Sequence, residues 1–124
     1  MTTTISLERM EAYKHHARRR EAEQQRMLVQ RREFAWALAR RAAMLLKQQY
    51  GATRVVACGS LAHGAWFSSR SDIDLMAEGI PPEKFWRAWA ALDPLSSDFE
   101  IDLIAGEAVA SNMLAVIDRE GVEL

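Results

Sequence analysis

The sequence has 124 residues, of which 49% are hydrophobic and 27% charged, as expected for one small globular domain. No apolar run approaches the roughly 20 residues that a membrane span needs, and the polar N-terminus lacks the hydrophobic segment of a secretion signal. The single cysteine, Cys58, excludes an internal disulfide and a zinc site built from several cysteines. Together these features predict a cytoplasmic protein.

The net charge of −1 conceals two halves of opposite sign. Residues 1–50 hold 11 Lys and Arg against 5 Asp and Glu, a balance of +6, whereas residues 51–124 hold 5 against 12, a balance of −7. A solvated charged helix joined to an acidic domain is the simpler interpretation. The alternative is a basic arm that binds an acidic partner, RNA or a second subunit. Direct nucleic-acid binding by the acidic half is not expected.

A long helix is predicted for the first fifty residues. Ser6 is a suitable N-cap with Glu8 in the first turn, and neither Gly nor Pro occurs before Gly51, a natural end for the helix. From residue 7 to residue 50 such a helix would span roughly 65 Å, which is more than a domain of this size can cover.

The two halves of this helix differ in apolar content. The half that ends near residue 26 is strongly charged, whereas the half that begins at Met27 carries a fuller apolar stripe. The sequence therefore predicts a projecting basic helical arm, residues 1–26, and a domain, residues 27–124. A break near residues 22–25, which would make the arm a separate helix, is the alternative.

The rest of the chain alternates strands and helices. Strands are expected at about 53–58, 72–78 and 99–104, and helices at about 82–92 and 107–120. With the first helix, the order α-β-β-α-β-α predicts an α/β or α+β fold with a small mixed sheet flanked by helices. Phe85, Trp86 and Trp89 recur at helical spacing and are expected in the core. Trp66 and Phe67 are expected to anchor a loop rather than to stack on a base.

Two carboxylates next to a small-residue turn suggest chemistry. Gly59-Ser60 ends the first strand, and Asp72 and Asp74 begin the second, where alternation points both side chains to one face. Glycine lets a phosphate approach the backbone, Ser60 can donate a hydrogen bond, and a helix that starts there would aim amides at an anion. The pattern suits a divalent cation that carries a nucleotide polyphosphate.

A third carboxylate interrupts the apolar run of the third strand. Asp102 lies within Ile101-Asp102-Leu103-Ile104, on what we predict to be a short internal strand, where an unpaired charge is costly. If this strand lies beside the second, three carboxylates gather and can hold two Mg²⁺ ions. The alternative for Asp102 is an exposed residue on an edge strand.

These residues resemble a known family. Gly59-Ser60, then Ser71-Asp72-Ile73-Asp74, then the lone strand acid Asp102 are similar to the polymerase-β-like nucleotidyltransferase superfamily. The resemblance is closest to its short branch, the minimal nucleotidyltransferases (MNT), many of which are antitoxins to HEPN ribonuclease toxins. The tail Arg119–Leu124 also resembles the end of such chains, and the resemblance covers about residues 51–124.

The resemblance implies a site and a reaction. The implied metal ligands are Asp72, Asp74 and Asp102, and Gly59 and Ser60 are implied to hold the triphosphate. His63 and Ser71 are further nucleotide-binding candidates, with a solvated surface or loop position as the alternative for each. The implied reaction is transfer of AMP from ATP, in several members to a tyrosine of the partner toxin, which silences the toxin. Two features depart from the family pattern: eleven residues separate Ser60 from Asp72, where ten are common, and His63 stands where arginine is frequent.

Three functions remain open on the sequence alone. The leading hypothesis is a Mg²⁺-dependent adenylyltransferase, the antitoxin to a HEPN toxin, because the chain is too short to carry a second domain for a small acceptor. The second is a catalytically weak or inactive nucleotidyltransferase fold that neutralises its partner by direct binding, with the basic arm bound to that partner. The third is a small-molecule nucleotidyltransferase completed by oligomerisation through the arm.

Overall fold

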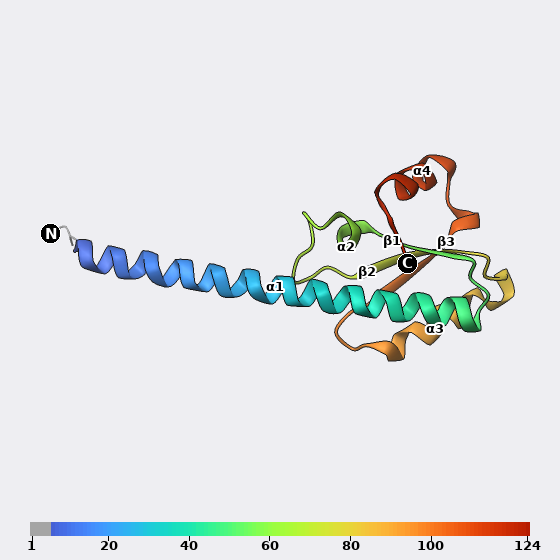
Figure 1. Cartoon of the computed structure of the whole chain (residues 1–124), viewed down its shortest axis with the longest axis horizontal. Helices are drawn as coiled ribbons and strands as arrows, with labels where there is room; N and C mark the ends of the chain where they lie inside the picture. The colour runs from blue at the N-terminus through green and yellow to red at the C-terminus, as the bar shows by residue number, and fades with distance from the viewer. Residues whose placement is uncertain (1–5) are drawn as a thin grey trace.

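One uninterrupted helix, α1 (Leu7–Gln49), dominates the computed structural model, which describes residues 6–124. The Ser6 hydroxyl accepts a hydrogen bond from the Arg9 N–H at 3.2 Å, so the predicted N-cap is confirmed. The helix continues through residues 22–25, so no break separates an arm from the rest. Its N-terminal half projects far beyond the sheet (Figure 1). The first five residues of the predicted arm lie outside the described residues.

In the described part of the chain, four strands form one mixed sheet in the order β3-β2-β1-β4. Its strands are β1 (Arg54–Cys58), β2 (Ile73–Glu78), β3 (Ile101–Ala105) and β4 (Val122–Glu123). β1 is antiparallel to β2 and β4, and β2 is parallel to β3. The mixed sheet with flanking helices confirms the predicted fold class. The tail was not predicted as a strand, yet β4 pairs with β1 and covers an edge that would otherwise be open.

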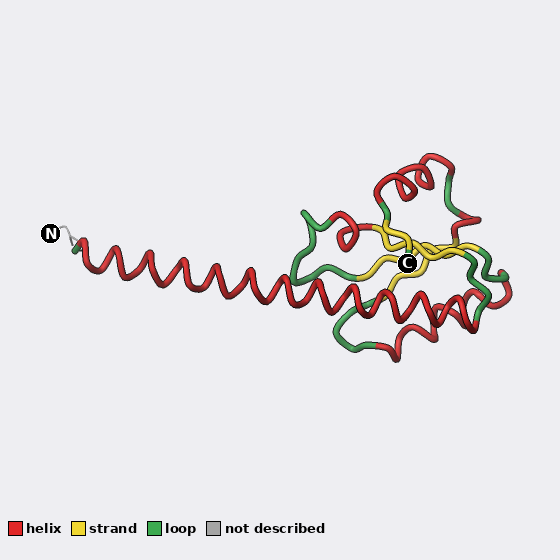
Figure 2. Tube along the Cα trace, in the orientation of Figure 1, coloured by secondary structure: helices red, strands yellow, loops and turns green. Residues whose placement is uncertain are grey.

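Helices cover the two faces of the sheet unequally. The C-terminal half of α1 and α3 (Phe85–Leu92) lie on one face, and α4 (Ser111–Glu120) lies on the other (Figures 1 and 2). The main core fills the α1–α3 side, where α1 presents a narrow, alanine-rich stripe. Its buried residues are Ala35, Leu38, Ala39, Ala42, Ala43 and Leu46. A smaller cluster under α4 joins Val56, Cys58, Met76 and Ile117.

Short turns of 3₁₀ helix account for differences from the predicted boundaries. They occur at Pro82–Lys84, Asp93–Leu95 and Gly106–Ala108, so α4 begins later than the predicted residue 107. Trp89 is half-buried and its indole N–H donates to the Ile101 carbonyl at 2.9 Å. Trp86, expected in the core, is instead 72% exposed, so that prediction is wrong. Within residues 6–124, no helix combines the length and apolarity needed to cross a bilayer.

Candidate functional site

The predicted site residues meet at one edge of the sheet. Because β1 is antiparallel to β2 and β2 is parallel to β3, the end of β1 and the starts of β2 and β3 share this edge. Cys58 is paired with Asp74, and Asp74 with Asp102, in consecutive register. Asp72 immediately precedes β2, and the five-residue helix α2 (Gly59–His63) immediately follows β1. Residues separated by more than forty positions are thereby brought together.

Gly59 packs directly against the carboxylate of Asp74. Its φ of 67° lies in the left-handed region, where any other residue is strained. A Cβ at Gly59 would also overlap Oδ2 of Asp74. The turn that was predicted to receive phosphates therefore lies against a predicted metal ligand, and only glycine permits this approach.

The structure places Asp102 differently from the prediction. The strand that carries it, β3, is at the edge of the sheet rather than inside it, and Asp102 is exposed. Asp102 is therefore not the costly buried charge that was predicted, because water reaches its carboxylate freely. The inference from strand order holds, since β3 lies beside β2 with Asp102 next to Asp74. Position in register, rather than burial, brings Asp102 to the site.

The three carboxylates form one electrostatic unit. Burial raises the pKa of Asp74, and the negative charges of Asp102 and then Asp72 raise it further. Within the described chain, no three His, Cys, Asp or Glu side chains form a ready metal cage. Mg²⁺ is usually held by one or two carboxylates together with substrate phosphates rather than by an all-protein cage. The oxygen donors of Asp74 and Asp102 fit that type of site.

Removing the charge at position 74 should stabilise the metal-free protein at neutral pH. The folded-state pKa of Asp74 is raised, so the native state binds its proton more tightly than the unfolded chain does. Stability is therefore lost as the pH rises through the folded-state pKa. We expect Asp74→Asn to raise the melting temperature near pH 7, and this gain to shrink as the pH falls toward the ordinary carboxyl range. Thermal melts across that pH range, with chelator present, test this.

The matched control is Asp93→Asn, which removes an exposed carboxylate at the end of α3. This variant should melt without the same dependence on pH. A lower melting temperature for Asp74→Asn at neutral pH would contradict the electrostatic account of the site.

Cys58 lies next to the site, but its thiol is unreactive. The side chain is buried under α4, and burial followed by the charge of Asp74 raises the pKa of its thiol to about 11. The thiol is therefore protonated at neutral pH, which disfavours a nucleophilic role. The interpretation of Cys58 as a small buried apolar residue is confirmed.

Two arginines of α1 hold α2 and the loop before β2, and sequence reasoning missed them. Nη2 of Arg31 donates to the carbonyl of Ser71 at 3.1 Å, and Nη2 of Arg32 donates to the carbonyl of Leu61 at 2.9 Å. Arg31 also stacks over the ring of Phe99 at 4.0 Å, just before β3. No local signal in the sequence marks this pair, because Arg40 and Arg41 form a second adjacent pair in the same half of the helix. Through these contacts α1 positions α2, which follows β1, and the segments that precede β2 and β3.

The two remaining nucleotide-binding candidates, Ser71 and His63, have different surroundings. The hydroxyl of Ser71 accepts a hydrogen bond from the Ser68 N–H at 2.8 Å, so its side chain closes the loop. His63 is exposed and stacks in parallel on Trp66, with ring centroids 4.2 Å apart. Phe67 is 5% exposed and anchors the loop as predicted, whereas Trp66 is 72% exposed and does not.

Comparison with known proteins identifies the fold. No family model matches this sequence, and no curated protein matches it. Among solved structures, a protein whose description assigns it to the minimal nucleotidyltransferases is 26% identical, with a TM-score of 0.50 over 80% of this chain and 94% of that one. The fold is that of a minimal nucleotidyltransferase. A mutant of the toxin–antitoxin pair MntA–HpeT is also similar in fold, with 18% identity and a TM-score of 0.56 over 68% of this chain and 69% of that one.

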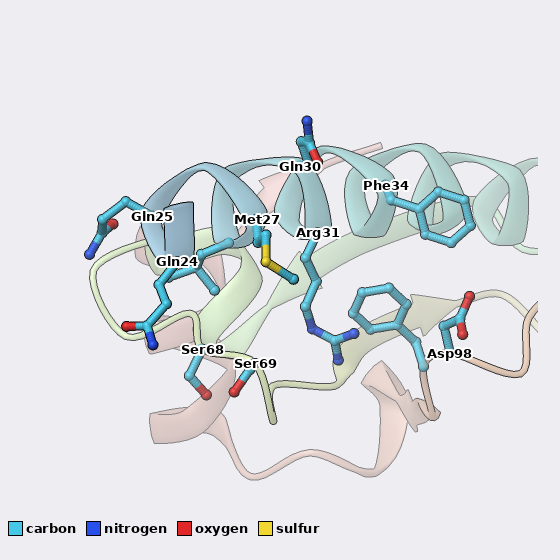
Figure 3. A pocket seen from close by; sticks show the side chains of 11 residues that line it. Gln24, Gln25, Met27, Gln30, Arg31, Phe34, Ser68, Ser69 and Asp98 are labelled. Atoms are coloured by element: carbon cyan, nitrogen blue, oxygen red, sulfur yellow. The ribbon is translucent and has the colours of Figure 1, made fainter. Parts of the chain in front are cut away.

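A large cleft of this minimal nucleotidyltransferase fold lies where the arm meets the site edge. It has a volume of about 760 Å³ and is open to solvent between α1 and the loops at residues 68–69 and 98–99 (Figure 3). Met27 and Phe34 line it from the helix and are 68% and 51% exposed. The two loops run directly into β2 and β3, so the cleft adjoins the strands that bear the carboxylates.

Proposed function

We propose that this protein is a Mg²⁺-dependent nucleotidyltransferase that moves AMP from ATP to a protein partner and acts as the antitoxin to a HEPN toxin. The observation that carries the proposal is the register of Asp74 beside Asp102, with the Gly59 backbone packed against Asp74. Carboxylate oxygens and a glycine turn at one sheet edge supply what a metal-bound triphosphate needs.

Each group has a defined part in the proposed transfer. Asp72, Asp74 and Asp102 would hold divalent cations, and Gly59 and Ser60 would contact the triphosphate. Divalent cations would activate the attacking hydroxyl and neutralise the triphosphate and the leaving pyrophosphate. The acceptor oxygen forms a bond to the α-phosphorus, while the bond from that phosphorus to the bridging oxygen breaks and releases pyrophosphate.

A protein acceptor accounts for features that the transfer of a nucleotide alone does not. The large cleft beside the site is lined by exposed Met27 and Phe34 together with glutamine and serine side chains, a surface suited to a polypeptide. The similarity in fold to a toxin–antitoxin pair supports a toxin as the partner.

The proposal is tested by labelling. Purified protein is incubated with Mg²⁺ and ATP labelled on the α-phosphate, with and without the product of the neighbouring gene, and the products are separated on a denaturing gel. Label on the partner, dependent on Mg²⁺, supports transfer of AMP. Absence of label, together with a stable complex on gel filtration, would reject transfer in favour of neutralisation by binding.

Binding without catalysis is the second candidate, and the projecting arm favours it. Among the residues that the structure describes, deleting residues 1–25 removes none that is buried, because the helix contributes to the core from about Leu28 onward. We expect this variant to remain folded. If the protein acts by transfer, the variant should still label its partner, at a lower rate because docking is weaker.

The same deletion gives a different result if the protein acts by masking. The truncated variant should then fail to form the complex, and toxin activity should return in full. Gel filtration with the partner and a toxin activity assay separate the two results, and the melting temperature of the variant verifies that it is folded.

A further inference from the structure

A second, smaller cleft lies on the face of the sheet that carries the carboxylates. It has a volume of about 220 Å³ and is enclosed by α2, the loop after it and the end of α4. Gly59 and Ser60 form part of its wall, so it begins where the triphosphate is proposed to bind. Its lining residues from α2 and the loop after it are His63 and Trp66, and those from the end of α4 include Glu120 and Gly121.

Trp66 presents a large aromatic surface to this cleft. It is 72% exposed, and its ring is stacked on His63 with an interplanar angle of 3°. A tryptophan that does not serve the core, although its neighbour Phe67 does, has no role in packing that explains its place. A flat and accessible aromatic pair is a suitable surface for a nucleobase, which gains stability from stacking on such rings.

Glu120 defines which part of a nucleotide can occupy the cleft. Its contact with Arg119 is 3.9 Å long and exposed, so it contributes little and leaves the carboxylate free to accept hydrogen bonds. A carboxylate repels phosphate but accepts hydrogen bonds from hydroxyl and amino groups. This end of the cleft is therefore unsuited to the triphosphate and suited to a nucleoside.

Gly121 places Glu120 at the cleft. A Cβ at position 121 would overlap Val56 of β1 and the carbonyl of Ile117, so the end of α4 descends onto the sheet only because this residue is glycine. The chain then turns into β4, which pairs with β1. The tail Arg119–Leu124, which resembles the end of minimal nucleotidyltransferase chains, thus closes the cleft and places Glu120 at its rim.

We propose that this cleft binds the nucleoside part of the nucleotide, with the base stacked on the Trp66–His63 pair and the donor groups of the nucleoside directed at Glu120. The triphosphate would extend across Gly59 and Ser60 toward Asp74. The inference rests on the proposed function and adds the location of the base and the residues that hold it. The ligand class is a ribonucleoside triphosphate with a stacking base.

The test compares two ligands that share the phosphates but not the nucleoside. Calorimetric titrations in the presence of Mn²⁺ use α,β-methylene ATP, which cannot transfer AMP, and inorganic triphosphate. Loss of one stacked base should weaken binding about tenfold or more. Trp66→Ala should therefore weaken the binding of the ATP analogue by that factor and leave the binding of inorganic triphosphate unchanged. Trp66→Phe should recover most of the affinity for the analogue.

Trp86→Ala is the matched control, since Trp86 is also 72% exposed but lies on α3, on the opposite side of the sheet. It should change neither affinity. The inference is overturned if Trp66→Ala binds the analogue as tightly as the wild type does, or if the substitution weakens the binding of both ligands equally. It is also overturned if the wild type does not bind the analogue. If the analogue binds in a manner that depends on Trp66 but no partner is labelled, the proposed transfer of AMP is rejected and the nucleoside-binding cleft is supported.

Discussion

Substituting both Asp72 and Asp74 by asparagine is expected to abolish AMP transfer while the domain stays folded. The carboxylates would hold the ions that stabilise the charge of the transition state, a contribution of several kcal/mol. A loss of about 4 kcal/mol corresponds to a rate about a thousandfold lower. The melting temperature should not fall, because Asp74 is destabilised as an anion by burial and by its acidic neighbours. Initial rates of partner labelling and thermal melts give both quantities.

A second double variant provides the control for charge. Glu83→Gln with Asp93→Asn removes two exposed carboxylates that flank α3, on the opposite face of the sheet from α4. It should label the partner at the wild-type rate. If the Asp72/Asp74 variant labels as fast as this control, these carboxylates are not the metal ligands of a transfer reaction.

Gly59→Ala should damage both the fold and the site. The left-handed backbone at Gly59 costs a residue with a Cβ about 1–2 kcal/mol. The added Cβ would also displace the Asp74 carboxylate, on which metal binding is proposed to depend. We therefore expect a lower free energy of unfolding and, in the fraction that remains folded, loss of Mn²⁺-dependent nucleotide binding. Chemical denaturation and calorimetry measure the two effects separately.

Gly51→Ala separates backbone strain from displacement of the carboxylate. Gly51 has a φ of 80°, but a Cβ there would meet its nearest neighbours only at ordinary contact distances of 3.8 Å or more. This variant should lose a similar amount of stability and keep full nucleotide binding. Equal binding by the two glycine variants would show that the contact between Gly59 and Asp74 has no role in the site.

The fold class was predictable from the sequence because it depends on local patterns, and the same patterns placed the candidate site residues near the ends of their strands. Absence of Gly and Pro predicted α1, alternation predicted the strands, and the spacing of Asp72 and Asp74 after Gly59-Ser60 predicted a shared edge. The place of Asp102 at an edge strand was not accessible, because strand order is set by pairing between distant segments. A carboxylate in an apolar run looks the same in an internal strand and an exposed edge.

Contacts between distant segments explain what was missed. The hydrogen bonds from Arg31 to a loop carbonyl and from Arg32 to a carbonyl of α2 join residues about 30 to 40 positions apart. An arginine pair on a charged helix gives no local sign of such partners. Trp66 and Phe67 are neighbours with opposite environments, which only the path of the loop decides. The exposed side chain of Trp66 indicates a nucleoside site only together with its neighbours in space, His63 and Glu120.

The most direct test of this account is Mn²⁺ binding by the intact protein in the presence of α,β-methylene ATP, followed by the loss of the free-ion signal in electron paramagnetic resonance. The account predicts saturable binding by the wild type that requires the nucleotide and is lost in Asp74→Asn. At a free concentration about 100 times Kd, the bound ion should also stabilise the wild type by about 2.7 kcal/mol. Equal Mn²⁺ binding by wild type and Asp74→Asn, or no binding by either, would contradict a metal-dependent nucleotide site at this edge of the sheet.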